Sequence, residues 1–190
     1  VMNGFRTELA NKILGFNAHI IVEPYNISLD SSKFSNKDLK ILSRDLILTN
    51  SGEGVLINKK AAKGLALRGY SPEDFLKLEF IKRGNFVGNP NELVDNNISI
   101  GKNLSLDYDL NVGDKISIMS TSGIETIVGT LPKQENYLIT SIFDSGLADF
   151  DRNIAFLNIE NLENLFDLDS STRSLEVYLK NPLNIDSTKL

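Results

Sequence analysis

Apolar residues recur along the chain at two kinds of spacing, and these spacings divide it into predicted helices and strands. Phe5, Leu9, Ile13 and Phe16 follow one another at intervals of three or four residues, which predicts an amphipathic helix over 1–16. Apolar runs bounded by Gly, Pro, Asn and Asp predict strands instead. The predicted strands cover 18–22, 39–49, 55–58, 61–67, 98–100, 115–119, 137–143, 154–157 and 175–179.

Shorter helices are predicted between and after the strands. Ser71 is a favourable N-cap, and Pro72 suits the first position of the helix that follows. Asn158 is the expected cap of another helix, whose apolar residues lie on one face. The predicted helices cover 72–80, 104–109, 159–166 and a tail after 182. Helices and strands therefore alternate irregularly, which indicates an α/β (α+β) fold.

Polar and glycine-rich segments are interpreted as connections. The segment 50–54 carries two glycines between two predicted strands, so a hairpin turn is expected there. A second turn is expected at 146–152, and the polar segment 26–38 is expected to connect two elements.

One long connection between two predicted strands is unusually apolar. It lies between 119 and 137, whereas a hairpin loop commonly contains about 2–5 residues. A disordered segment of this length is expected to be polar, but this one contains Ile124, Ile127, Val128 and Leu131. We interpret it as a projecting arm, neither strand nor ordinary turn, whose apolar tip is buried in a partner. The alternative is a loop that packs on its own domain.

Composition excludes several classes of function. The 190 residues carry a net charge of −5, one His and no Cys. Disulfides and thiolate metal sites are therefore excluded, and nucleic acid is not expected as a partner because no long basic run exists. No run approaches the ~20 apolar residues of a membrane span. Position 1 is not Met, which favours an excised domain of a longer protein.

Motif searches give no catalytic site. The Gly-Lys-Asn sequence at 101–103 lacks the earlier Gly and the following Ser or Thr of a phosphate-binding loop. His19 has no second His to complete a metal site. Asp144, Asp149 and Asp151 surround a glycine, but their spacing favours a solvated turn over a calcium loop. By elimination we expect a binding module with no catalytic or metal-binding residues, and a small hydrolase with an unrecognised site is the alternative.

Several short motifs in a fixed order resemble one family. They are 1–5 (VMNGF) with 8–9 and 13–15, then 67–69 with Pro72, then 100–101 with 104 and 112–116, then 142–143 with 154–155, 159 and 165–166. Together they span nearly the whole chain, which resembles the LolC/LolE-type lipoprotein-releasing ABC transporter subunits.

The resemblance implies a fold and a location. It implies a MacB-like periplasmic domain with two small mixed α/β subdomains, one inserted in the other, and a projecting β-hairpin hook. Residues 1–80 and 172–190 would form the membrane-proximal (Porter-like) subdomain, and 81–171 the inserted (Sabre-like) subdomain that carries the hook at 121–134. The parent protein would cross the bacterial inner membrane several times and expose this domain on the periplasmic face.

The resemblance also implies partners. The hook would recruit the periplasmic chaperone LolA, so that lipoprotein cargo passes from the inner membrane toward the outer membrane. A second transmembrane subunit and the cytoplasmic ATPase LolD would complete the transporter. This domain would bind no cofactor, because ATP is used by the ATPase subunit. The alternative is a MacB-like periplasmic domain of an ABC exporter for another substrate, such as a peptide or a drug.

Specific residues carry the expected contact with LolA. The hook residues are Thr126, Ile127, Val128, Gly129, Thr130, Leu131 and Pro132, and the pad residues are Lys133, Gln134 and Glu135. A hook is typical of LolC and of the related LolF, and LolE lacks it. Two positions depart from the family pattern: Ile127 stands where Pro is usual, and Glu135 stands where the pad can carry Arg.

Overall fold

The computed structural model describes residues 17–25, 29, 41–58, 61–126 and 129–180, and most of them form strands. The strands are β1 (Ile20–Val22), β2 (Ser43–Asn58), β3 (Ala61–Tyr70), β4 (Phe86–Gly88), β5 (Asn97–Gly101), β6 (Lys115–Thr126), β7 (Gly129–Phe143), β8 (Ile154–Asn158) and β9 (Ser174–Leu179). The helices are α3 (Pro72–Phe75), α4 (Glu79–Lys82), α5 (Lys102–Tyr108), α6 (Ala148–Asn153) and α7 (Ile159–Phe166), with 3₁₀ turns at Pro90–Glu92 and Ser170–Thr172. The mixed α/β class expected from the sequence is confirmed.

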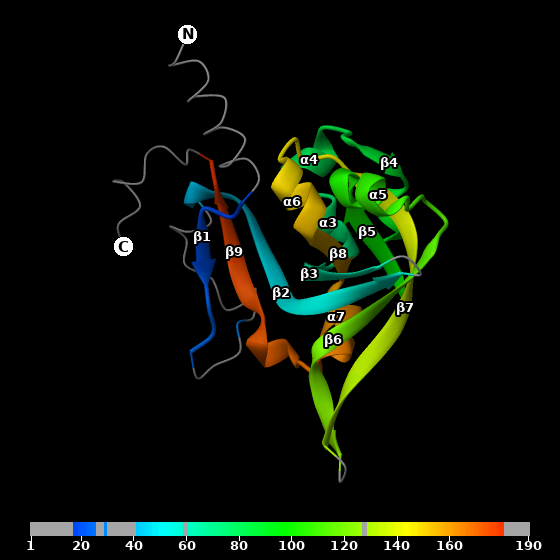
Figure 1. Ribbon diagram of the computed structural model, residues 1–190. Helices are drawn as coiled ribbons and strands as arrows, with labels where there is room; N and C mark the ends of the chain where they lie inside the picture. The colour runs from blue at the N-terminus through cyan, green and yellow to red at the C-terminus, as the bar shows by residue number, and fades with distance from the viewer. Residues whose placement is uncertain (1–16, 26–28, 30–40, 59–60, 127–128, 181–190) are drawn as a thin grey trace.

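Six strands close on themselves as a barrel (Figure 1). The second half of β2 pairs with β3 on one side and with β6 on the other. From β3 the ladder continues through β8, β5 and β7 and returns to β6. A closed ladder leaves none of its member strands with an open edge along the paired stretch, which protects the backbone from pairing with other chains. The short strand β4 pairs with residues 141–143 of β7, beyond the stretch that pairs with β6.

One long strand belongs to the barrel and to a second, three-stranded sheet. The first half of β2 pairs with β9, and the other side of β9 pairs with β1. The hairpin turn expected at 50–54 is therefore wrong, because these residues lie in the middle of β2 and pair with β3. Their glycines reflect close packing: a Cβ on Gly52 would lie 2.7 Å from the ring of Phe166. Glycine in a strand often marks such a close approach.

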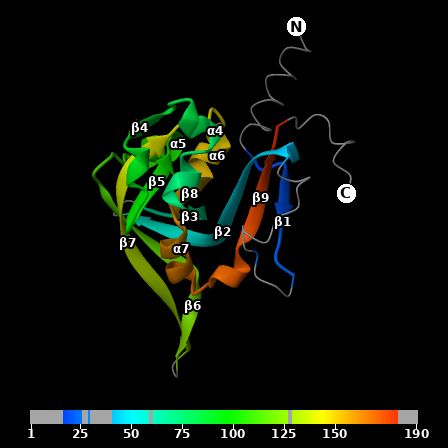
Figure 2. The ribbon, with the colours of Figure 1, turned by 180° about the vertical axis from the view of Figure 1, so that it is seen from behind.

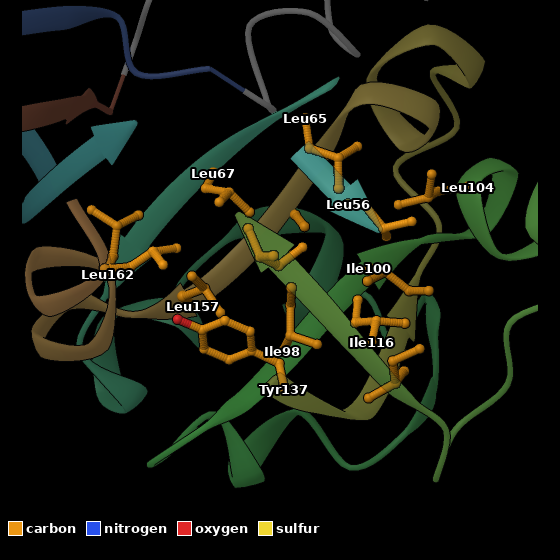
Figure 3. Close-up of a cluster of buried hydrophobic side chains, with 14 of the residues drawn as sticks. Leu56, Leu65, Leu67, Ile98, Ile100, Leu104, Ile116, Tyr137, Leu157 and Leu162 are labelled. Atoms are coloured by element: carbon orange, nitrogen blue, oxygen red, sulfur yellow. The ribbon is translucent and has the colours of Figure 1, made fainter. Parts of the chain in front are cut away.

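The barrel encloses one hydrophobic core, and a second core lies outside it. Figure 3 shows Leu56, Leu67, Ile98 and Ile100 converging inside the barrel. Phe156 belongs to the second core, where its ring lies 5.0 Å from that of Phe143 and 5.3 Å from that of Phe75 (centroid distances). Successive side chains of a strand point to opposite faces, so β8 contributes to both cores. Both of its faces are covered, which explains its continuous apolar sequence.

A buried carboxylate joins the three-stranded sheet to the barrel. Glu176 on β9 accepts hydrogen bonds from the hydroxyl of Tyr70 on β3, at 3.0 Å, and from that of Tyr178, at 2.9 Å. The guanidinium of Arg68 lies 3.9 Å from the same carboxylate. Burial and the neighbouring carboxylate both raise the pKa values of Tyr70 and Tyr178 above their ordinary range. Both hydroxyls thus remain protonated donors at neutral pH, and the buried charge is satisfied.

Local signals predicted several elements correctly, and two helices differ from expectation. The caps are confirmed, because Ser71 accepts from the backbone N–H of Asp74 and Asn158 accepts from that of Glu160. The helix expected over 72–80 is two short helices, α3 and α4, separated by an extended backbone at Leu78. The turn expected at 146–152 contains α6. The helix expected over 1–16 and the tail after 182 lie outside the described residues, as does most of the connection at 26–38.

The two subdomains expected from the sequence stay a prediction. The described segments nearest to the two ends of the chain, β1 and β9, do pair with each other. Within the barrel, β3 from the expected membrane-proximal part pairs with β8 from the expected inserted part. The barrel therefore draws strands from both sides of the expected boundary at 80.

Gly101 provides a test of how tightly the helices pack on the barrel. A Cβ at this position would lie 2.0 Å from the backbone oxygen of Asp151, so the α5 and α6 segments would have to separate. We expect Gly101→Ala to lower the free energy of unfolding by about 1–3 kcal/mol, measured by urea denaturation. Gly64→Ala is the matched control, since a Cβ there meets nothing within 4 Å and the free energy should not fall. Equal stability of the two variants would contradict this packing.

Candidate partner-binding arm

The candidate site is a two-stranded ribbon that continues β6 and β7 beyond the barrel (Figures 1 and 2). Beyond the barrel, Gly123 pairs with Pro132, Ile124 with Leu131, and Thr126 with Gly129. The projecting β-hairpin expected from the family resemblance is thus confirmed, and its role as a hook stays a prediction. The interpretation of the segment as neither strand nor ordinary turn is wrong. Its Thr and Ile residues suit a strand, and residues 123–126 pair with 129–132 across the ribbon.

Five of the seven residues expected to form the hook, 126 and 129–132, lie in this ribbon, and the other two lie outside the described residues. Those two are Ile127 and Val128. Gly129 has a φ of +115°, a backbone angle that favours glycine. The side chain of Leu131 is 57% exposed, and Pro132 is exposed as well. Pro132 donates no backbone hydrogen bond, which is compatible with a ribbon that has open edges.

The three pad residues have different surroundings. Gln134 is exposed. Glu135 is half-buried and pairs with Ile118 across the ladder. The pKa of Tyr137 is raised first by the burial of its own hydroxyl and second by the nearby carboxylate of Glu135. The ammonium of Lys133 donates a hydrogen bond of 2.6 Å to the backbone oxygen of Asn164 in the last turn of α7. Lys133 is therefore already engaged by its own domain.

A bulge marks the point where the ribbon leaves the barrel. Between the pairs Met119↔Gln134 and Gly123↔Pro132, β6 contains residues 120–122 whereas β7 contains only Lys133. The hydroxyl of Thr121 donates a hydrogen bond of 2.7 Å to the backbone oxygen of Glu53 on β2. Bulges bend a strand and increase its twist. We call residues 119–123 and 132–134 the arm root.

The end of α7 beside the arm root is itself fixed by an ion pair. Arg173 donates two hydrogen bonds to the carboxylate of Glu163, at 2.6 and 2.7 Å, and Asn50 on β2 donates a third at 3.3 Å. The carboxylate raises the pKa of Arg173 above its ordinary value. Glu163 precedes Asn164, so one helix end contacts both the arm root and the residue before β9.

Sequence reasoning missed Thr121, Asn164 and Arg173. Nothing in the spacing of apolar residues distinguishes them, because their contacts depend on the bulge and on the docking of α7 against β6 and β7. A hydroxyl in a strand, an asparagine in a helix and an arginine in a polar segment are ordinary surface patterns.

The other candidate residues have structural partners. Nδ1 of His19 accepts a hydrogen bond of 2.8 Å from the backbone N–H of Leu179. Asp144 pairs with Lys102 at 2.8 Å, which lowers the pKa of the aspartate. Asp151 accepts from the backbone and hydroxyl of Ser145, and burial raises its pKa.

The described parts of the chain lack two other features that would suggest a function. They contain no group of three or more His, Cys, Asp or Glu that is arranged to hold a metal ion. None of the helices they contain is long and apolar enough to cross a membrane.

Comparison with curated proteins gives relatives over almost the entire chain. LolC of Xylella fastidiosa (strain Temecula1) is 24% identical over 178 residues, which cover 90% of this chain and 42% of the relative. LolC of Neisseria meningitidis serogroup B is 23% identical over 191 residues, 97% of this chain and 45% of the relative. The chain is similar to LolC. No protein-family model matches it. The resemblance to LolC/LolE-type subunits inferred from the sequence is confirmed.

A solved structure supports the fold of this LolC-like chain. The periplasmic region of MacB from Actinobacillus actinomycetemcomitans superimposes with a TM-score of 0.54 at 10% identity, covering 89% of this chain and 77% of that one. The fold is therefore that of a MacB-like periplasmic domain. The LolC relatives are named as transmembrane proteins of a lipoprotein-releasing system, not as enzymes. The chain spans less than half the length of these relatives.

The ion pair at the end of α7 gives a test of this part of the site. Arg173→Met would leave the largely buried carboxylate of Glu163 without its charged partner. We expect the free energy of unfolding to fall by about 2–3 kcal/mol, below the range for a fully buried pair because Arg173 keeps partial solvent contact. The double variant Glu163→Met/Arg173→Met should recover much of the loss, because no uncompensated charge remains. A double variant as unstable as the single one would contradict this assignment.

Proposed function

We propose that this domain is the periplasmic part of a transmembrane subunit of a Lol-type lipoprotein-releasing ABC transporter. In this role it lies on the periplasmic face of the bacterial inner membrane. The proposal is supported by the similarity to LolC over 90% of the chain and by the MacB-like fold. The parent protein acts with a second transmembrane subunit and the ATPase LolD, which uses the ATP, so that this domain needs no cofactor.

The arm is the observation that carries the more specific proposal, which is recruitment of the chaperone LolA. Beyond the arm root, the pairs that follow Gly123↔Pro132 join β6 only to β7. The described residues therefore place no third strand beside this part of the ribbon. Leu131 is more than half exposed on it. Such a side chain gains free energy when a partner buries it, about 1.5–3 kcal/mol for complete burial.

The proposed interface follows the order of residues along the ribbon. The hook residues 126–132 insert into an apolar cavity of the chaperone, and Gln134 and Glu135 contact its rim. Lipoprotein cargo then passes from the transporter to the chaperone that the hook holds, on its way toward the outer membrane. Burial of the hook aliphatics supplies the favourable free energy, and ordering of the two partners opposes it.

Substitution of the exposed hook leucine tests the proposal. Leu131→Asp places a charge in the proposed apolar cavity, where no partner compensates it. We expect the affinity for a LolA-type chaperone, measured by calorimetry, to fall by roughly tenfold or more. Val128→Asp is expected to act in the same way. The melting temperature should not change, because Leu131 is exposed in the free domain.

Leu106→Asp is the matched control, since this leucine on α5 is 69% exposed and lies away from the arm. Its affinity for the chaperone should equal that of the unmodified chain. Unchanged affinity of Leu131→Asp would argue against the hook. Absence of any chaperone binding by the unmodified chain would favour an exporter of another substrate.

A further inference from the structure

The direction of the arm is determined at the arm root, where β6 has more residues than β7 between two consecutive ladder pairs. Three residues of β6, 120–122, lie opposite the single residue Lys133 of β7. On the barrel side of the bulge, β6 pairs with both β2 and β7. Its last pair with β2 is Gly54↔Ser120, at the first residue of the bulge. A bulge concentrates bending and twist at one place. Contacts made at the bulge therefore control where the ribbon points.

Lys133 makes such a contact with the C-terminal end of α7. Its ammonium donates to the backbone oxygen of Asn164, two residues before the helix ends at Phe166. The last four carbonyls of a helix lack partners within the helix, and a cation there is favoured by the helix dipole. Lys133 is half-buried, so its aliphatic stem packs against the protein while the charged end reaches this carbonyl.

α7 is a fixed anchor for this contact. Most of its side chains are buried, among them Leu162, Leu165 and Phe166, which belong to the barrel core. Its Glu163 is held from the other side by Arg173, just before β9 begins. The carbonyl that receives Lys133 is thus fixed with respect to both the barrel core and the three-stranded sheet.

The other strand of the arm root is also held by a hydrogen bond, which we call a tie: the hydroxyl of Thr121 on β6 donates to the backbone oxygen of Glu53 on β2. One tie on each strand restrains the ribbon against bending about the bulge. We propose that Lys133 is a positioning residue, which holds the arm in one direction by bonding to the end of α7, and is not a contact residue for the partner. The consequence for affinity rests on the proposed function: an arm held in one direction loses less freedom on binding.

Spin labels measure the direction of the arm in the free chain. The sequence has no Cys, so Leu131→Cys on the ribbon and Leu106→Cys on α5 provide two unique labelling positions, both exposed. Double electron–electron resonance should give one narrow distance distribution in this background. Lys133→Met keeps the aliphatic stem but removes the donor, and we expect the width of the distribution to roughly double. Lys133→Arg, which keeps a donor, should remain narrow.

Lys115→Met is the matched control, because Lys115 is an exposed lysine on the same hairpin at its barrel end. It should leave the distribution unchanged. Melting curves of all variants verify that the barrel is intact. A distribution for Lys133→Met that is as narrow and as centred as that of the background would overturn the proposal.

Affinity for the chaperone separates this proposal from the proposed function. It is measured on variants that keep Leu131 and Leu106 and carry no spin label. If both hold, Lys133→Met binds about fivefold more weakly, because the arm must be ordered on binding. A loss of affinity with an unchanged distribution would overturn the proposal and make Lys133 a contact residue. A broadened distribution in a chain that binds no chaperone would support the positioning role while refuting the proposed function.

Discussion

The structure depends on the pairing of β2 with β6, which closes the barrel. Without it β2 and β6 would be two open edges, and the inner core would be exposed along both. The closing segment is short, Gly54 to Ile57 against Ser117 to Ser120, but it includes Leu56 and Ile118, both completely buried. Closure also determines where the ribbon begins, because β6 can follow β7 alone only after β2 has ended its pairing. The arm is thus a direct result of how the barrel closes.

The exposed arm and the packed barrel place different demands on the same two strands. Within the barrel, alternate residues such as Ile116 and Ile118 are buried, and the register is fixed because a shift of one residue would expose them. Beyond the bulge the described pairs join β6 only to β7, and the hydrogen bonds of Thr121 and Lys133 hold the two strands at the arm root. Natural proteins usually shorten or cover such edges. Leu131, an exposed apolar side chain on this ribbon, is the residue that the proposed partner would cover.

Local chemistry predicted the parts of the fold that depend on neighbouring residues. Ser71 before Pro72 and Asn158 before α7 indicated helix starts because a cap is satisfied within three residues. Gly52 led to the wrong prediction of a turn at 50–54, because its role depends on a residue that is distant in the sequence. Its lack of a side chain makes room for Phe166, which lies far along the sequence, and nothing near Gly52 shows this. The arm was recognisable from the length and apolar content of its segment, whereas the contact of Lys133 with Asn164 depends on a bulge that sequence spacing does not reveal.

The continuity of β2 has a mechanical consequence. One backbone runs from the sheet that contains β1 and β9 into the barrel, and Glu176 and its tyrosines bridge the same junction. In Figure 1, β1 and β9 lie along one side of the molecule, and the β6–β7 ribbon projects downward from the barrel on the other side. A rotation of β1 and β9 would therefore pass into the barrel along a continuous strand, without a connecting loop between the two sheets. Because β2 pairs with β6 up to the arm root, the same strand connects that sheet to the base of the arm.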